Sequence, residues 1–195
     1  RKRMIADVPL GVFLSGGLDS AIVTAVAAKI RASEGIDAYT IGFADNAYDE
    51  RAEARDTAAA ISRLPDVDLR HHELEVTPAD FDVLRKLIRH FGQPFADASM
   101  LPTFLLSQFT RTGLTVALSG DGADEIFGGY ERYIAMRLFH SMQRLPMPTQ
   151  VMFKAFAAVL PDSGERTFRG RLRRLCQLFA NSKKNAYFSL LDRCP

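Results

Sequence analysis

The stretch LSGGLDSAIV, residues Leu14–Val23, interrupts an apolar run with a serine, two glycines and an aspartate before apolar spacing resumes. The residues that lead into it, VPLGVFL (Val8–Leu14), are few, apolar and β-branched at one edge, which predicts a buried strand. After the glycines, apolar residues recur at helical spacing until about Ser33–Gly35, which predicts a helix. The stretch therefore predicts a strand, a tight glycine turn and the N-terminus of a helix in succession.

Strands and helices are predicted to alternate along the chain that follows. The expected strands cover 37–43, 68–76 and the start of LTVALSGDG at 114–118, and the expected helices cover 49–62, 77–92 and about 100–112. Such alternation is typical of right-handed crossovers and a parallel sheet with helices on both faces. The sequence therefore predicts an α/β fold with a doubly wound, mostly parallel sheet over residues 1–140, followed by a helical extension over residues 141–195.

Composition and charge exclude several classes of protein. The 195 residues are 47% hydrophobic and 25% charged, which is enough for one sizeable core. The net charge is +2, although residues 161–195 alone hold eight Lys/Arg against three Asp/Glu. No apolar run has the length of a membrane span or signal peptide. The two cysteines, Cys176 and Cys194, favour a reduced, cytoplasmic setting over a disulfide framework. Because the sequence starts at Arg1, we expect a piece of a longer protein.

Two loops with related sequences follow predicted strands. The first loop is SGGLDS (Ser15–Ser20), and the second loop is SGDGADE (Ser119–Glu125). In open parallel sheets, ligands bind outside the carboxyl ends of the strands, where the strand order reverses. Gly16 and Gly17 would bring backbone N–H groups close to a ligand, and the helix N-terminus behind them favours an anion such as phosphate. We therefore expect both loops to line one phosphate-binding crevice, with hydroxyl donors from the serines.

Acidic residues in both loops point to a metal ion. Asp19 lies in the first loop, and Asp121, Asp124 and Glu125 lie in the second. These carboxylates would repel a bare phosphate, but Mg²⁺ bridges carboxylate and phosphate oxygens. Two acidic loops facing one crevice therefore suggest a metal–polyphosphate complex, of which Mg²⁺–ATP is the leading candidate. Plain glycine turns with exposed acids remain the alternative.

Two common nucleotide motifs are missing from these loops. The Walker A pattern needs a lysine after its glycines, and none follows Gly16 or Gly17. The dinucleotide fingerprint fails in the first loop, and Gly120–Glu125 matches only G-x-G-x-x-E. Without such a lysine, transfer of the γ-phosphoryl group is not favoured.

The motif SGGLDS resembles the pyrophosphate loop (PP-loop) of the ATP pyrophosphatase family, which cleaves ATP between the α- and β-phosphates and adenylates a substrate. Together, VPLGVFLSGGLDSAIV, YTIGF and LSGDGADEIFGGYERY resemble the synthetase domain of glutamine-hydrolysing asparagine synthetases over about Asp7–Tyr133. The resemblance implies that the side-chain carboxylate of aspartate attacks the α-phosphorus, giving β-aspartyl-AMP and pyrophosphate. Ammonia would then displace AMP to give asparagine.

The resemblance also implies roles for individual residues. It places Leu14 and Ile41 at the border of the adenosine, with Ser119 and Gly120 beside the nucleotide. The pyrophosphate would be held by the first loop, through Ser15, Gly16, Gly17, Asp19 and Ser20. Asp121 and Asp124 would be the catalytic residues, with Asp121 promoting formation of the acyl-adenylate and Asp124 binding Mg²⁺ together with Asp19.

Departures from the family pattern leave the acceptor open. Asp121 stands where asparagine synthetases carry Glu, Ala21 replaces a frequent serine, and Ala123 stands where Ser or Gly is common. The alternatives are a related PP-loop synthetase or amidotransferase acting on another carboxylate, or a non-catalytic nucleotide-binding module. Asp97 and Ser99 are candidates for contact with the acceptor amino acid.

Expected partners also follow from the resemblance. Aspartate and ammonia would be the substrates, and the glutaminase domain with its N-terminal cysteine has no counterpart in this sequence. We therefore expect this chain to be inactive alone or to depend on free ammonia. A homodimer is a further expected partner state. The basic run RTFRGRLRR (Arg166–Arg174) could meet tRNA, as in some pyrophosphate-loop enzymes, but a solvated helix face is favoured over a nucleic-acid partner.

Overall fold

The computed structural model describes residues 1–44, 49–76, 83–93, 97 and 99–142, together with positions 152, 155–156, 158–159, 170, 172–173 and 176. The chain divides into two compact units, Arg1–Ala123 and Asp124–Pro195. The first unit contains the sheet and most of the predicted site residues.

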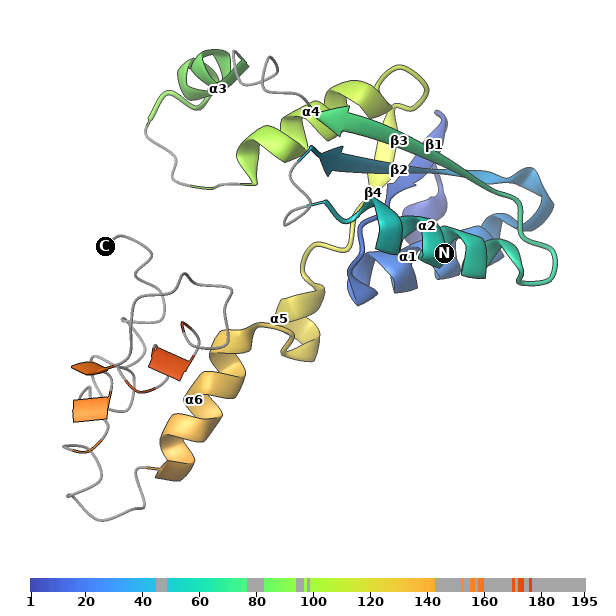
Figure 1. Ribbon diagram of the computed structural model, residues 1–195. Helices are drawn as coiled ribbons and strands as arrows, with labels where there is room; N and C mark the ends of the chain where they lie inside the picture. Colours follow the sequence, from blue (N-terminus) through green and yellow to red (C-terminus); the bar gives the residue numbers. More distant parts are fainter. Residues whose placement is uncertain are drawn as a thin grey trace. The chain divides into compact units, whose positions relative to one another are not determined.

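Four parallel strands form the sheet of the first unit, in the order β3-β2-β1-β4 (Figure 1). They are β1 (Leu10–Phe13), β2 (Ile36–Phe43), β3 (Leu69–Val76) and β4 (Val116–Leu118). The chain moves outward from β1 through β2 to β3, and then returns to the other side of β1 to form β4. The strand order therefore reverses between β1 and β4, which is the point where open sheets of this kind bind ligands.

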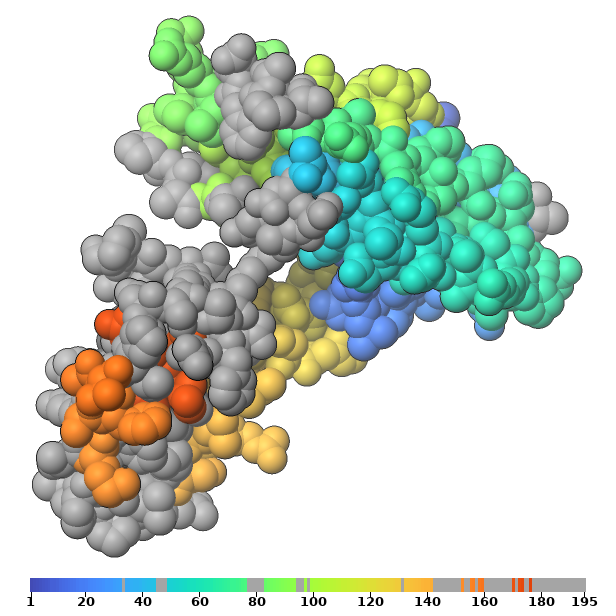
Figure 2. Space-filling model, viewed as in Figure 1, coloured from blue at the N-terminus to red at the C-terminus, as the bar shows by residue number. Residues whose placement is uncertain are grey.

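Helices pack on both faces of this sheet. The alternation of side chains along β2 shows this: Ile36 and Ala38 join a core with α1 (Leu18–Arg31) and α2 (Arg51–Ser62). Ile41 and Phe43 point the other way, into a second core with α3 (Leu84–Phe91) and α4 (Met100–Thr110). On the molecular surface α1 and α2 lie side by side, in blue and cyan (Figure 2). The predicted doubly wound, parallel α/β fold is confirmed.

Element boundaries differ from the sequence prediction for local reasons. β1 begins at Leu10, not Val8, because Pro9 has no N–H, and its carbonyl instead accepts the N–H groups of Thr115 and Val116. The first helix ends at Arg31, and a 3₁₀ turn, η2 (Ala32–Glu34), leads to Gly35 at φ 76°. Of the helix predicted at 77–92, the structure describes Leu84–Phe91, and the expected N-cap at Thr77 lies outside the described residues.

The second unit begins within α5 (Ala123–Phe127) and continues into α6 (Glu131–Met142). Between them the Tyr130 hydroxyl donates a hydrogen bond to Glu125, and the Arg132 guanidinium lies 3.8 Å from the centre of the Tyr130 ring. The helical extension predicted at 141–195 falls mostly outside the described residues. A short 3₁₀ turn, η1 (Lys2–Met4), opens the chain. Within the described part of the chain, no helix combines the length and apolar character needed to cross a membrane.

Candidate functional site

The first loop follows β1, and the second follows β4, so both start from neighbouring strands at the carboxyl end of the sheet. Gly120 packs directly on the start of α1. A Cβ atom at this position would lie 2.8 Å from the Ser20 backbone nitrogen and 3.1 Å from the Asp19 carbonyl carbon, closer than side chains tolerate. The two loops, about a hundred residues apart in sequence, therefore meet at the point where the strand order reverses.

Hydrogen bonds inside the first loop fix its shape. The Ser15 N–H donates to Ser20 Oγ at 3.1 Å, and the Gly17 N–H donates to Ser15 Oγ at 3.2 Å. The Ser20 hydroxyl lies 3.0 Å from the Gly17 carbonyl oxygen and 2.9 Å from Ser15 Oγ. Ser20 is buried, and Gly17 precedes the first residue of α1. The two serine hydroxyls thus hold the turn that presents the loop and the N-terminus of α1.

One backbone donor of the first loop is bound to a carboxylate side chain of the protein itself. The Gly16 N–H donates to Glu50 Oε2 at 3.1 Å. The carboxylate comes from the residue that precedes α2, 34 positions along the chain. It occupies the position that an oxygen of a bound phosphate would take on this N–H, so the residues present fit an anionic ligand. The sequence analysis missed Glu50. The available signal was its place directly before a helix that follows the carboxyl end of a predicted strand.

Asp19 and Asp121 are the two acids of the loops that lie in the first unit. Asp19 is half-buried in the first turn of α1, and its carboxylate has no hydrogen-bond or ion-pair partner among the described residues. The carboxylate of Asp121 accepts a hydrogen bond from the Ser119 hydroxyl at 2.9 Å. No group of three or more His, Cys, Asp or Glu side chains in the described ranges is arranged to hold a metal by itself. Mg²⁺ takes few protein carboxylates and completes its coordination shell with phosphate oxygens and water, so the separate carboxylates of the two loops fit this ion.

Asp124 belongs to the second unit. The Gly129 N–H donates to the Asp124 carbonyl oxygen at 3.1 Å, and a Cβ atom at Gly129 would collide with the Asp124 carboxylate. Its expected part in binding Mg²⁺ stays a prediction, as do the roles assigned to the other loop residues.

Leu14 and Ile41, expected at the adenosine, both pack in the interior of the first unit. The Leu14 side chain belongs to the core beneath α1 and α2, and Ile41 is partly buried in the second core. The Leu14 carbonyl accepts a hydrogen bond from the Thr40 hydroxyl at 2.7 Å. Thr40 Oγ1 also lies 2.7 Å from His71 Nε2. Since the single hydroxyl proton is donated to Leu14, His71 must donate from Nε2, which fixes its neutral tautomer. A buried chain of hydrogen bonds thus joins β3 to the base of the first loop.

The surroundings of His71 keep it neutral. Burial lowers its pKa below the ordinary value of 6.5, and this effect outweighs the nearby carboxylate of Glu73. His71 Nδ1 lies 3.6 Å from Glu73 Oε1, but both Glu73 oxygens accept hydrogen bonds from Arg55, at 2.7 and 2.9 Å. The neighbouring His72 instead stacks on Tyr39. His71 and His72, which are adjacent on β3, thus point to opposite faces of the sheet.

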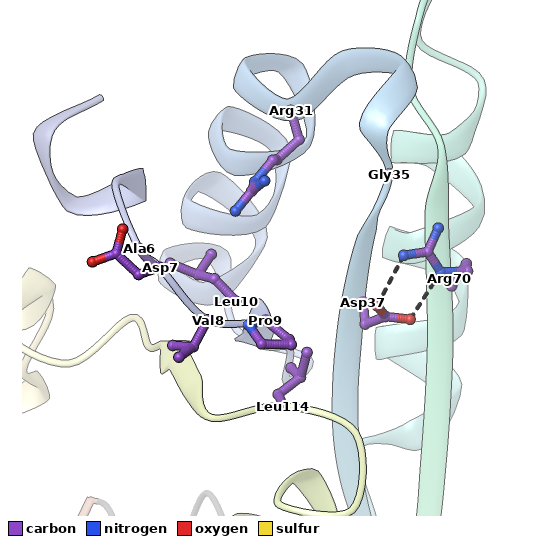
Figure 3. Close-up of a pocket in the computed structure, with 10 residues that line it drawn as sticks. All are labelled: Ala6, Asp7, Val8, Pro9, Leu10, Arg31, Gly35, Asp37, Arg70 and Leu114. Atoms are coloured by element: carbon purple, nitrogen blue, oxygen red, sulfur yellow. Dashed lines mark hydrogen bonds and ion pairs between the residues drawn. The ribbon is translucent and has the colours of Figure 1, made fainter.

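A cavity of about 420 Å³ lies at the opposite end of the sheet (Figure 3). Its lining includes residues at the start of three strands, Leu10 of β1, Asp37 of β2 and Arg70 of β3, so the cavity opens at their amino ends. There Arg70 donates two hydrogen bonds to Asp37, at 2.9 Å each. Ligands of doubly wound sheets bind at the carboxyl ends, and the charges in this cavity neutralise one another. We therefore assign the functional site to the two loops and not to this cavity.

The expected acceptor residues form a local turn. Asp97 Oδ1 accepts hydrogen bonds from the Ser99 N–H at 2.8 Å and from the Ser99 hydroxyl at 2.7 Å, just before α4 begins at Met100. Residues 94–96 and 98 lie outside the described part, as does most of the basic run Arg166–Arg174.

Comparison with known proteins bears on the whole chain. The family model for asparagine synthase matches residues 1–194. Asparagine synthetase [glutamine-hydrolyzing] 1 of Bacillus subtilis (strain 168) is 34% identical over 160 residues, which is 82% of this chain and 24% of the relative. Asparagine synthetase [glutamine-hydrolyzing] 2 of Oryza sativa subsp. japonica is 36% identical over 140 residues, or 66% of this chain and 22% of the relative. The chain thus spans about a quarter of the length of these relatives.

A solved structure also shows some similarity. Glutamine-dependent NAD+ synthetase from Acinetobacter baumannii, in complex with adenosine diphosphate, matches with a TM-score of 0.41 and 18% sequence identity. The match covers 100% of this chain and 43% of that one.

Proposed function

The chain belongs to the asparagine synthase family, and on that premise we propose that it is the nucleotide-binding part of an ATP-dependent, amide-forming ligase. The observation that carries the proposal is the close approach of Gly120 to the backbone of Asp19 and Ser20. This contact joins two glycine loops beside a helix N-terminus, at the point where the strand order reverses. A nucleotide with several phosphates is the ligand that suits such a site.

The first loop would bind the β- and γ-phosphates, which leave as pyrophosphate. The N-terminus of α1 supplies backbone donors that are already oriented as charge develops on this leaving group, and the Gly16 N–H would join them once the Glu50 carboxylate is displaced. Ser15 and Ser20 would act by keeping the turn in shape, since their hydroxyls bond within the loop. Asp19 and Asp124 would hold Mg²⁺, which when bound would neutralise negative charge on the phosphates.

The second loop would place the acceptor against the nucleotide. Ser119 and Gly120 would flank the nucleotide, and the Ser119 hydroxyl orients the carboxylate of Asp121. Asp121 would promote formation of the acyl-adenylate by positioning, because catalysis here depends on bringing two anionic reactants together. We propose aspartate as the acceptor, ammonia supplied by a glutaminase domain as the second substrate, and a cytoplasmic location.

The reaction products test this proposal. The protein, given Mg²⁺–ATP, ammonia and a panel of carboxylates, should release pyrophosphate and AMP, with aspartate giving the highest rate. Release of orthophosphate in place of pyrophosphate would contradict adenylation. A higher rate with another carboxylate would assign the chain to a related synthetase. Nucleotide binding without turnover on any carboxylate would support only the nucleotide-binding part of the proposal.

A further inference from the structure

Among the described residues, Glu50 is the acidic side chain that accepts a hydrogen bond from a backbone donor of the first loop. Glu50 precedes the first residue of α2, where acidic side chains commonly accept N–H groups of their own helix. Its carboxylate makes no such capping bond and accepts the Gly16 N–H instead. The side chain is therefore directed at the loop proposed to bind pyrophosphate.

The backbone packing around Gly16 holds Glu50 beside the loop. A Cβ atom at Gly16 would lie 2.9 Å from the Cβ of Glu53 and 3.3 Å from the Cβ of Glu50, so the first turn of α2 is pressed against the loop. Only a glycine fits here. The Glu50 side chain itself is exposed, so its carboxylate can turn away into solvent while its backbone stays in place.

Nearby cations in the described structure are engaged elsewhere. Arg51 donates to both oxygens of Asp49 and to Glu75, and Arg55 binds Glu73. Glu53, whose Cβ would lie 2.9 Å from a Cβ at Gly16, and Asp19 of the loop itself are also acidic. A phosphate that takes the Gly16 N–H must therefore displace one carboxylate and remain close to several.

From this geometry we infer that Glu50 competes with the nucleotide for the Gly16 N–H and thereby makes binding at this loop depend on a divalent cation. The inference rests on the proposed function. Metal-free ATP carries its full negative charge against Glu50, whereas the charge of the Mg²⁺ complex is partly neutralised before it meets the loop. Glu50 thus discriminates against the metal-free nucleotide.

Two substitutions separate the effect of the negative charge on Glu50 from the effect of its hydrogen bond with the Gly16 N–H. Glu50→Gln removes the charge but keeps an oxygen that can accept the Gly16 N–H. Glu50→Ala removes both. Asp56→Asn, on the exposed side of the same helix, is the matched control because it removes one negative charge further along α2.

The test is calorimetric titration of each variant with ATP, once with Mg²⁺ and once with EDTA. We expect Glu50→Gln to bind metal-free ATP on the order of tenfold more tightly than the wild type, and to change Mg²⁺–ATP binding less than about threefold. Glu50→Ala should gain at least as much, and Asp56→Asn should behave as the wild type. Thermal unfolding checks that all three variants fold.

Each result decides a different question. An unchanged ratio of metal-free to Mg²⁺–ATP affinity in Glu50→Gln, with normal wild-type binding, overturns the inference and leaves the proposed function standing. A loss of Mg²⁺–ATP binding in Glu50→Gln also overturns it, because Glu50 would then be a ligand and not a competitor. If the wild type bound no nucleotide in the Mg²⁺ buffer and none in the EDTA buffer, both the inference and the proposed function would be overturned.

Discussion

The two ends of the sheet use charged side chains in different ways. At the amino end, Arg70 bonds to Asp37 and Asp68, and His72 Nε2 lies 2.8 Å from Asp37. At the carboxyl end, Asp19 has no partner within the described residues, and the Gly16 N–H is met by a carboxylate from another helix. Charges that neutralise one another stabilise a fold, whereas an unmatched charge beside a loop of backbone donors is available to a ligand. This difference is why we propose that function resides at the carboxyl end, although the cavity lies at the other.

Exchanging one aspartate for asparagine at each end tests this comparison most strongly. Asp19→Asn should lower Mg²⁺-dependent pyrophosphate release about 100-fold or more, because a proposed metal ligand is lost. Its unfolding free energy should stay within about 0.5 kcal/mol of the wild type, since no bond is broken. Asp37→Asn should leave pyrophosphate release nearly unchanged. It should lower the unfolding free energy by about 1–2 kcal/mol, because its hydrogen bonds with Arg70 are lost.

Pyrophosphate release and urea unfolding, measured on both variants, give the answer. Asp37 also supplies a pH signature. Its hydrogen bond from Arg70 lowers its pKa below 3.8, so its stabilising effect is present above that pH and is lost as the pH falls through the lowered pKa. In Asp37→Asn, the unfolding free energy should therefore fall less as the pH is lowered. If both variants lost activity and stability to the same degree, the two ends would not differ in role.

The fold could be predicted because its signals are local. Apolar runs indicated the strands at 8–14 and 37–43, alternation indicated the strand at 68–76, and helical spacing indicated the helices around them. The boundaries differed where backbone hydrogen bonds decide them. Pro9 cannot donate, so β1 begins one residue after it, and the N–H groups of Thr115 and Val116 at the start of β4 donate to the Pro9 carbonyl. No sequence pattern reports such pairing in advance.

The candidate site could be predicted only in part. The motifs identify Ser15–Ser20 and Ser119–Glu125 as connections that follow strands, although Leu18–Ser20 already lie in α1 and Ala123–Glu125 in α5. The reversal of strand order brings the two connections together, as the packing of Gly120 on Ser20 shows. Glu50 was missed, because its contact with Gly16 depends on how the start of α2 is placed against the loop that follows β1. The bond from Thr40 to Leu14 was missed too, since it depends on which residues of β1, β2 and β3 stand opposite one another.

Two glycine substitutions compare the two loops at the carboxyl end of the sheet with each other. Gly120→Ala should lower the unfolding free energy by about 1–3 kcal/mol, because its methyl group would press on the backbone of Ser20. At Gly17 a Cβ atom meets only Ser15 Oγ, at 3.4 Å, and φ is −80°, so Gly17→Ala should cost less than about 1 kcal/mol. Urea denaturation measures both. Equal costs would mean that the two loops are not held against each other through Gly120.

The smallest expected effect concerns His71, which links the edge strand β3 through Thr40 to the base of the first loop. Burial lowers its pKa below 6.5, so on acidification the unfolded chain takes up a proton before the folded one does. The stabilisation from neutral His71 is therefore complete above about pH 6.5 and is lost as the pH falls through the lowered pKa. Glutamine can donate to Thr40 as the neutral imidazole does, but it does not titrate.

Urea unfolding of the wild type and of His71→Gln, compared between pH 7.5 and pH 5, isolates this group, because the lowered pKa values of Asp37 and Glu73 act at more acidic pH. We expect the wild type to lose stability over this range and His71→Gln to lose less. If protonation at Nδ1 were instead stabilised by Glu73, 3.6 Å away, the wild type would gain stability as the pH fell. That sign would mean that the carboxylate, and not burial, governs this histidine, and that the Leu14 carbonyl at the base of the first loop is held most firmly in acid.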